Sequence, residues 1–173
     1  GLTNGLKHGT ITRRNMPSKP MIERAKRGPY DELYTPAEAL RHMLPHIPSG
    51  TIWESAPGKG NIVRLLEGAG REVVWSKKDY FDWQPDQWDV MVTNPPFSVK
   101  AKWLKRANDL GKPYALLLPV TALGSRACQL ELEGCQALFL PRRIDFTGGG
   151  APWFSVAWFC RDFHLPNQMC FVT

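Results

Sequence analysis

The sequence predicts an α/β fold in which a parallel or mostly parallel sheet is covered by helices on both faces. Two observations predict it. Apolar segments too short for helices alternate with amphipathic segments along residues 51–160, which is the pattern of β-α-β units. Turns rich in glycine or proline follow these apolar segments. In parallel sheets such turns lie at the carboxyl ends of the strands, where ligands bind.

The first elements are predicted by their end signals. Thr35-Pro36-Ala37-Glu38 has the residue types of a helix start, with Thr35 as the N-cap and Pro36 in the first helical position. A short strand is expected at residues 51–54. A helix is expected at residues 58–67, because apolar residues recur there at helical spacing and Gly68 ends the pattern.

The later elements continue the alternation. Residues 98–110 are amphipathic and closed by Gly111, and residues 114–119 are continuously apolar, as in a strand buried on both faces. A weaker helix is expected at residues 124–132. The remaining strands are expected at residues 72–76, 89–93, 136–140 and 154–160.

The net charge of +6 is concentrated at the N-terminus. Residues 1–28 hold seven of the 22 basic residues and one of the 16 acidic ones, so the rest of the chain is neutral. We therefore divide the chain into a basic, flexible arm, residues 1–29, and one domain, residues 30–173. Such an arm suits a polyanion such as nucleic acid, and a solvated tail is the alternative. The candidate nucleic-acid contacts in the arm are Arg13, Arg14, Lys19, Arg24, Lys26 and Arg27.

Composition excludes several classes of protein. No apolar run approaches the roughly 20 residues that span a bilayer, and the polar, then basic N-terminus does not read as a secretory signal, so a cytoplasmic protein is expected. Reduced cysteines in the core, and no metal site, are expected because neither cysteines nor histidines show ligand spacing. The four cysteines are Cys128, Cys135, Cys160 and Cys170.

A glycine turn follows the first predicted strand, in residues 52–60. Gly58 and Gly60 would let the backbone pass close to a ligand, and Glu54 could position a ribose or an aminoacyl group. An ordinary β-α turn is the alternative. A phosphate-binding P-loop is disfavoured, because Lys59 lies between the glycines and no Lys-Ser or Lys-Thr pair follows.

The third predicted strand leads directly into Asn94-Pro95-Pro96-Phe97. An exocyclic amino nitrogen is a weak nucleophile, because its lone pair is delocalised into the ring. The Asn94 side-chain oxygen and the Pro95 carbonyl could accept its two hydrogens on a turn that prolines make rigid. Phe97 would offer a face to an extruded base, and transfer of a methyl group from a sulfonium would need positioning rather than a nucleophile or metal. A proline-rich turn with Phe97 in the core is the alternative.

At these residues the chain resembles the class I S-adenosylmethionine-dependent methyltransferases, in the amino-methylating branch that contains N6-adenine methyltransferases. The resemblance covers about residues 30–160. It is greatest to the small DNA adenine methyltransferases of phages and mobile elements. It implies S-adenosyl-L-methionine as cofactor and a seven-stranded, doubly wound, Rossmann-like sheet with the last strand antiparallel.

The resemblance also implies roles for individual residues. The catalytic motif falls on Asn94, Pro95, Pro96 and Phe97. The cofactor-binding positions fall on Tyr34, Thr35, Pro36, Glu54, Ala56, Gly58, Gly60, Asp79, Tyr80, Phe81 and Asn94. Two positions depart from the family pattern: Ala56 stands at the first glycine, and the second strand has no acid before Asp79 to hold the cofactor ribose.

These features favour the N6 amino group of adenine in nucleic acid as the methyl acceptor, with DNA favoured over RNA. The same motif serves guanine N2 in ribosomal RNA and glutamine in release factors, and a cofactor- or nucleic-acid-binding module without catalysis is a further alternative. Arg142 and Arg143 could contact phosphates or be solvated charges. Because no target-recognition domain is evident, weak or short sequence specificity is expected, supplied by the arm and by loops after Phe97, Leu118 and Thr147.

Overall fold

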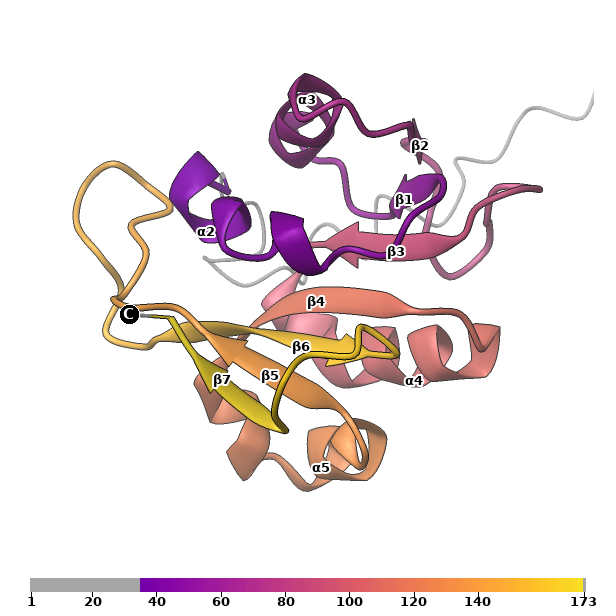
Figure 1. Ribbon diagram of the computed structural model, residues 1–173. Helices are drawn as coiled ribbons and strands as arrows, with labels where there is room; N and C mark the ends of the chain where they lie inside the picture. The colour runs from indigo at the N-terminus through magenta and orange to yellow at the C-terminus, as the bar shows by residue number, and fades with distance from the viewer. Residues whose placement is uncertain (1–34, 173) are drawn as a thin grey trace, which may run out of the picture.

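A seven-stranded sheet with helices on both faces forms the framework of residues 35–172, the part of the chain that the computed structural model describes (Figure 1). The helices are α2 (Ala37–Arg41), α3 (Asn61–Gly68), α4 (Lys100–Leu110) and α5 (Arg126–Leu132), with 3-10 turns η1 (Leu44–His46), η2 (Phe97–Val99) and η3 (Val120–Gly124). The strands are β1 (Ile52–Glu54), β2 (Val73–Trp75), β3 (Val90–Thr93), β4 (Tyr114–Pro119), β5 (Gln136–Phe139), β6 (Val156–Arg161) and β7 (Met169–Phe171).

The sheet has the strand order β2-β1-β3-β4-β6-β5-β7 and is mostly parallel, as predicted. Strands β1 to β4 pair in parallel, and β6 lies antiparallel between β4 and β5. The antiparallel strand is therefore the sixth and not the last. After β6 the chain turns back through Asp162 and His164, both at positive φ, and β7 pairs in parallel with β5. Strand β7 was not predicted, because an apolar stretch as short as residues 169–172 does not distinguish a strand from a loop.

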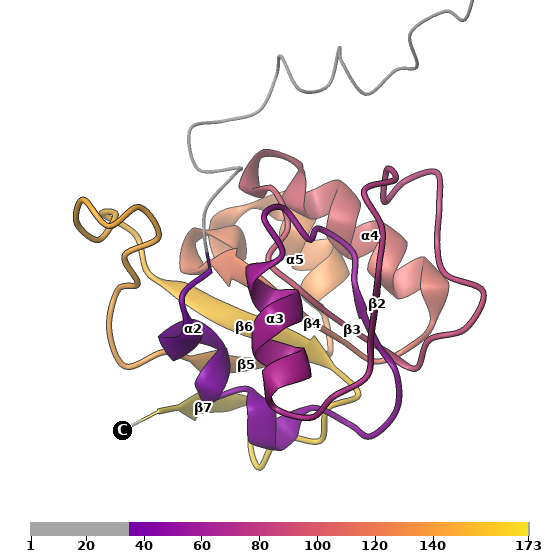
Figure 2. The same cartoon turned by 90° about the horizontal axis from the view of Figure 1, so that it is seen from above.

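Strand residues alternate between two hydrophobic cores, one on each face of the sheet. Val92 of β3 and Leu117 of β4 point toward α2 and α3, whereas Met91 and Leu116 point toward α4 and α5. Figure 2 shows α3 on one side of the strands and α4 and α5 on the other. Among the helices of residues 35–172, none is both long and apolar enough to cross a membrane.

The starts of two helices differ from the prediction. Helix α2 begins at Ala37 with Pro36 as its N-cap, so Thr35 is not the cap residue. Helix α3 begins at Asn61 rather than at residue 58, because Gly58 and Gly60 have φ of +51° and +77°, outside the right-handed helical region. Both differences release residues from helices into the turns at one end of the sheet.

The crossover from β2 to β3 forms no helix and packs against the sheet through a cluster of aromatic rings. Residues 76–89 form neither a helix nor a strand. Tyr80, from this crossover, is buried and stacks on Trp103 of α4, with ring centroids 3.9 Å apart and planes within 7°. Trp53 of β1 packs against Tyr80 and Trp88 at 5.5 Å and 5.0 Å. Stacked rings thus supply the apolar area that a crossover helix would otherwise bury.

Replacing Trp103 with alanine should lower the free energy of unfolding by about 3–5 kcal/mol, because a buried ring is lost from the stack. Trp75→Ala is the matched control, since Trp75 is 48% exposed on the edge strand β2. Its expected cost is about 0.5 kcal/mol. Denaturant unfolding measures both variants, and equal losses would contradict the stacked cluster as a source of stability.

Candidate functional site

The candidate site lies where β1 and β3 end. These strands are parallel neighbours, with Trp53 opposite Met91. The residues that follow each strand therefore meet at the carboxyl end of the sheet. The Thr93 hydroxyl donates a hydrogen bond to Oε1 of Glu54. The Ala56 amide donates to the same oxygen at 2.8 Å and to the Thr93 hydroxyl at 3.2 Å. The structure therefore brings the glycine turn and the Asn-Pro-Pro-Phe turn together.

Asn94 is held with its acceptor oxygen free. Its side-chain nitrogen donates to the Thr35 hydroxyl at 2.9 Å. Its Oδ1 is buried and has no hydrogen-bond partner within residues 35–172. A buried acceptor without a partner costs about 1–3 kcal/mol, so a group that supplies hydrogens is the expected occupant of the space it faces.

Thr35 and Asn61 connect this acceptor to the glycine turn. The Asn61 side chain, at the first position of α3, donates to the Thr35 carbonyl, and both residues are buried. Sequence reasoning missed Asn61. A buried asparagine directly after the second glycine was a usable signal, because a polar side chain among apolar helix positions needs a partner.

Helix α2, which follows Thr35, is anchored in turn to the sheet. Trp158 of β6 donates from its ring nitrogen to the Ala39 carbonyl at 2.7 Å. Pro36, another predicted cofactor residue, lies half-buried at the start of this helix. Tyr34 falls outside the described residues, as do all six predicted contacts in the basic arm.

Glu54 presents a second buried oxygen without a partner within residues 35–172, at the carboxyl end of β1. Its side chain is fully buried, and Oε2 lacks a partner in the described part of the chain. Burial raises the pKa of the Glu54 carboxyl from 4.5 to about 8, against the opposing effect of the hydrogen bonds from Thr93 and Ala56. A cation placed at Oε2 would favour the ionised carboxylate and lower this pKa.

The glycine turn has open space beside it. A Cβ added at Gly58 would meet only the Ala56 carbonyl oxygen, at 4.0 Å, although its φ of +51° disfavours other residues. Gly60 donates to the Pro57 carbonyl at 2.6 Å and leads into α3. Backbone that is bent and uncovered in this way can approach a bound ligand closely.

Phe97 is 7% exposed and packs edge-on against two other rings. Its centroid lies 6.5 Å from that of Phe146 and 5.9 Å from that of Phe154. Phe146 and Phe154 belong to the two stems of the loop between β5 and β6, so this loop is seated on the turn. Stacking of an extruded base on Phe97 stays a prediction.

The three residues predicted beside the cofactor adenine lie in the β2–β3 crossover. Asp79 is half-buried, and its carboxylate accepts a hydrogen bond from the Phe81 amide at 2.9 Å. Tyr80 is buried against Trp103, and its hydroxyl donates to the Trp103 carbonyl at 3.2 Å. The contacts of this crossover are therefore internal packing, and the cofactor contact of all three residues stays a prediction.

Arg142 and Arg143 both make contacts within the protein. Arg142 forms an ion pair with Glu38 of α2, although 71% of its side chain remains exposed. Arg143 donates to the Pro152 carbonyl at 3.2 Å. Both lie where the chain leaves β5 toward the loop seated on Phe97, and Figure 1 shows this loop, in orange, beside α2.

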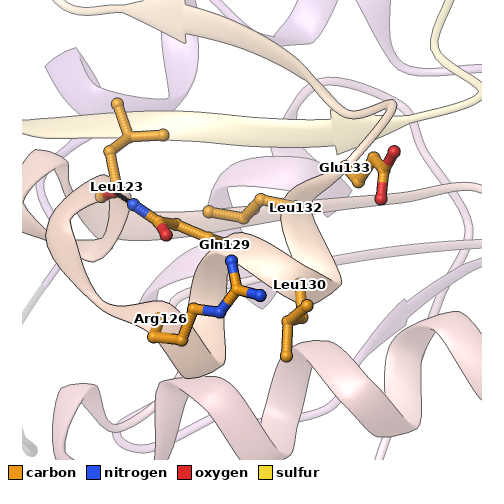
Figure 3. A pocket seen from close by; sticks show the side chains of 6 residues that line it. All are labelled: Leu123, Arg126, Gln129, Leu130, Leu132 and Glu133. Atoms are coloured by element: carbon orange, nitrogen blue, oxygen red, sulfur yellow. Dashed lines mark hydrogen bonds between the residues drawn. The ribbon is translucent and has the colours of Figure 1, made fainter.

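A hollow on the surface of α5 lies apart from this site (Figure 3). It is lined by Leu123, Arg126, Gln129, Leu130, Leu132 and Glu133. None of these side chains belongs to the turns after β1 and β3. Among residues 35–172 there is also no group of three or more His, Cys, Asp or Glu side chains placed to hold a metal ion.

Comparisons with known proteins identify the fold. No family model and no curated protein matches the chain. Among solved structures, the chain is similar to a dimethyladenosine transferase from Plasmodium falciparum, with a TM-score of 0.51 and 12% sequence identity. The match covers 74% of this chain and 62% of that one, so it spans less than two thirds of the transferase. Residues 35–172 thus have the Rossmann-like methyltransferase fold.

Proposed function

We propose that this protein transfers a methyl group from S-adenosyl-L-methionine to the N6 amino group of adenine in nucleic acid, with DNA as the preferred substrate. The observation that carries the proposal is the Asn94 side-chain oxygen, which is buried and without a partner in the described chain. It stands at the carboxyl end of β3, followed directly by two prolines.

Asn94 and Pro95 would orient the amino group as acceptors. The Asn94 Oδ1 would accept one amino hydrogen and the Pro95 carbonyl the other, which directs the nitrogen lone pair away from both. Thr35 holds the asparagine amide in this orientation before substrate binds, because its hydroxyl accepts a hydrogen bond from the Asn94 side-chain nitrogen at 2.9 Å. Acceptors fixed in advance stabilise the positive charge that develops on the nitrogen.

The residues at the end of β1 fit the cofactor. Glu54 offers an unpartnered buried carboxylate oxygen, which suits the ammonium group of the methionine part, and Gly58 leaves open space beside the turn. When bound, S-adenosyl-L-methionine supplies the methyl group on its sulfonium. Asn61 and Thr35 tie this cofactor side to Asn94, so both binding surfaces share one hydrogen-bonded frame.

Nucleic acid is the acceptor that the charge pattern supports best. The excess of basic residues lies in the N-terminal arm, and Arg142 and Arg143 stand beside the loop that is seated on Phe97. Dimethyladenosine transferase, the name of the structural neighbour, agrees with an adenine acceptor and makes RNA the main alternative. A protein glutamine fits the basic arm less well.

Asn94→Ala should lower kcat for methyl transfer by about 100-fold or more, because it removes an acceptor that stabilises the transition state. Asn94→Asp should retain more activity, since its carboxylate still offers an acceptor and can receive the Thr35 hydroxyl. Transfer of labelled methyl groups to DNA, ribosomal RNA and a glutamine peptide measures both variants and identifies the acceptor.

The control for these variants is Asn167→Ala, which truncates an exposed asparagine at the far edge of the sheet, just before β7. Its activity should equal that of the wild type. Full activity of Asn94→Ala on the preferred substrate would contradict the assigned role of Asn94.

Cofactor binding should depend on Glu54 and not on Asn167. S-adenosylhomocysteine should raise the Tm of the wild type and of Asn167→Ala, and should raise it little or not at all for Glu54→Ala, which lacks the carboxylate. A thermal-shift titration measures this. An equal shift in Glu54→Ala would mean that the cofactor is held elsewhere.

The contribution of Glu54 to the free energy of unfolding without cofactor should fall as the pH rises from about 4.5 to about 8. The pKa of Glu54 is about 8 in the folded chain and about 4.5 in the unfolded chain, so between these values the folded state holds one more proton. The expected slope is about −1.4 kcal/mol per pH unit from this group. Glu54→Gln should lack this slope. Denaturant unfolding at several pH values measures the free energy of unfolding of the variant and of the wild type. Identical slopes would contradict the raised pKa.

A further inference from the structure

Trp153 is the most exposed large apolar side chain among residues 35–172. It is 74% exposed, compared with 69% for Phe171 and 48% for Trp75. It lies in the loop between β5 and β6, and its ring meets that of Phe154 edge-on, with centroids 5.5 Å apart. An indole that the fold does not bury is available to a ligand.

The loop that carries Trp153 is held by its own hydrogen bonds. The Asp145 carboxylate accepts the amides of Thr147, Gly148 and Gly150, each at 2.9 Å. At the other end, Arg143 donates to the carbonyl of Pro152, the residue before the tryptophan. The backbone that leads to Trp153 is therefore held by bonds to Asp145 and Arg143.

Ring contacts connect this indole to the candidate site. Trp153 packs on Phe154, and Phe154 packs on Phe97 at 5.9 Å. Phe97 closes the turn that begins at Asn94. The exposed ring thus stands on the same support as the acceptor proposed to receive the target amino group.

We propose that Trp153 stacks on a nucleobase of the substrate strand that neighbours the target adenine. This rests on the proposed function and extends it to the strand around the target. Arg142, which pairs with Glu38 but keeps 71% of its side chain exposed, lies at the base of the same loop. An exposed aromatic face with cations nearby is the arrangement that binds single-stranded nucleic acid, by stacking and by contact with phosphates.

The test uses the full chain and a fluorescent oligothymidine with one central adenine. Trp153→Ala should weaken binding, measured by anisotropy, by about five- to hundredfold, and Trp153→Phe should weaken it less. Trp75→Ala is the matched control, because Trp75 is also exposed but lies on the edge strand β2, which β1, β3 and β4 separate from β6. Its affinity should be unchanged.

A second oligonucleotide identifies the base. Removing the base beside the adenine should weaken binding to the wild type and should cause no further loss in Trp153→Ala, because the stack is already absent. Losses that add in the variant would overturn the proposal. Unchanged oligonucleotide binding by Trp153→Ala would also overturn it. If Trp153→Ala changed the oligomeric state and not the binding, the indole would contact a second copy of the chain.

These readouts separate the two proposals. Binding is measured without methyl transfer, so an inactive wild type that binds the oligonucleotide through Trp153 would contradict the proposed function alone. An active enzyme whose affinity does not change in Trp153→Ala would contradict the stacking alone. S-adenosylhomocysteine should raise the Tm of Trp153→Ala as much as that of the wild type, because the indole lies outside the cofactor residues.

Discussion

The parallel pairing of β1 with β3 is the constraint on which the rest of the site depends. It brings the end of β1, at Glu54, beside the end of β3, at Thr93, and the two side chains hydrogen-bond directly. Thr35 then bridges the turns, since it accepts from Asn61 on one side and from Asn94 on the other. A shift of one residue in this register would exchange the faces of β3 and would separate these groups.

The site keeps two buried side-chain oxygens without partners in the described chain, Oε2 of Glu54 and Oδ1 of Asn94. Each reduces stability, because a polar atom removed from water without a partner loses its hydrogen bonds. The two cores on either face of the sheet offset this cost, as does the stack of Tyr80 on Trp103. Buried polar atoms retained at such a cost are characteristic of sites that bind ligands.

The sequence predicted much of this arrangement and missed what depends on contacts distant in the chain. Apolar runs and flanking glycines predicted β4 fully and α3 within three residues, because those signals are local. Strand β7 was missed, since its three apolar residues are too few to indicate a strand without the pairing with β5. The Asn-Pro-Pro-Phe turn was predicted from spacing. The link through Thr35 and Asn61 was not, because it joins residues 26 and 59 positions apart.

In the proposed mechanism, the turn after β3 presents two acceptors to an exocyclic amino group. The most direct test is the position of the methyl group on the product. Nucleic acid treated with the protein and S-adenosyl-L-methionine would be digested to nucleosides and analysed by mass spectrometry against synthetic standards. N6-methyladenine is the expected product. A methyl group on a ring nitrogen of adenine, or on carbon 5 of cytosine, would contradict it, because neither atom carries hydrogens of an amino group for Asn94 and Pro95 to accept.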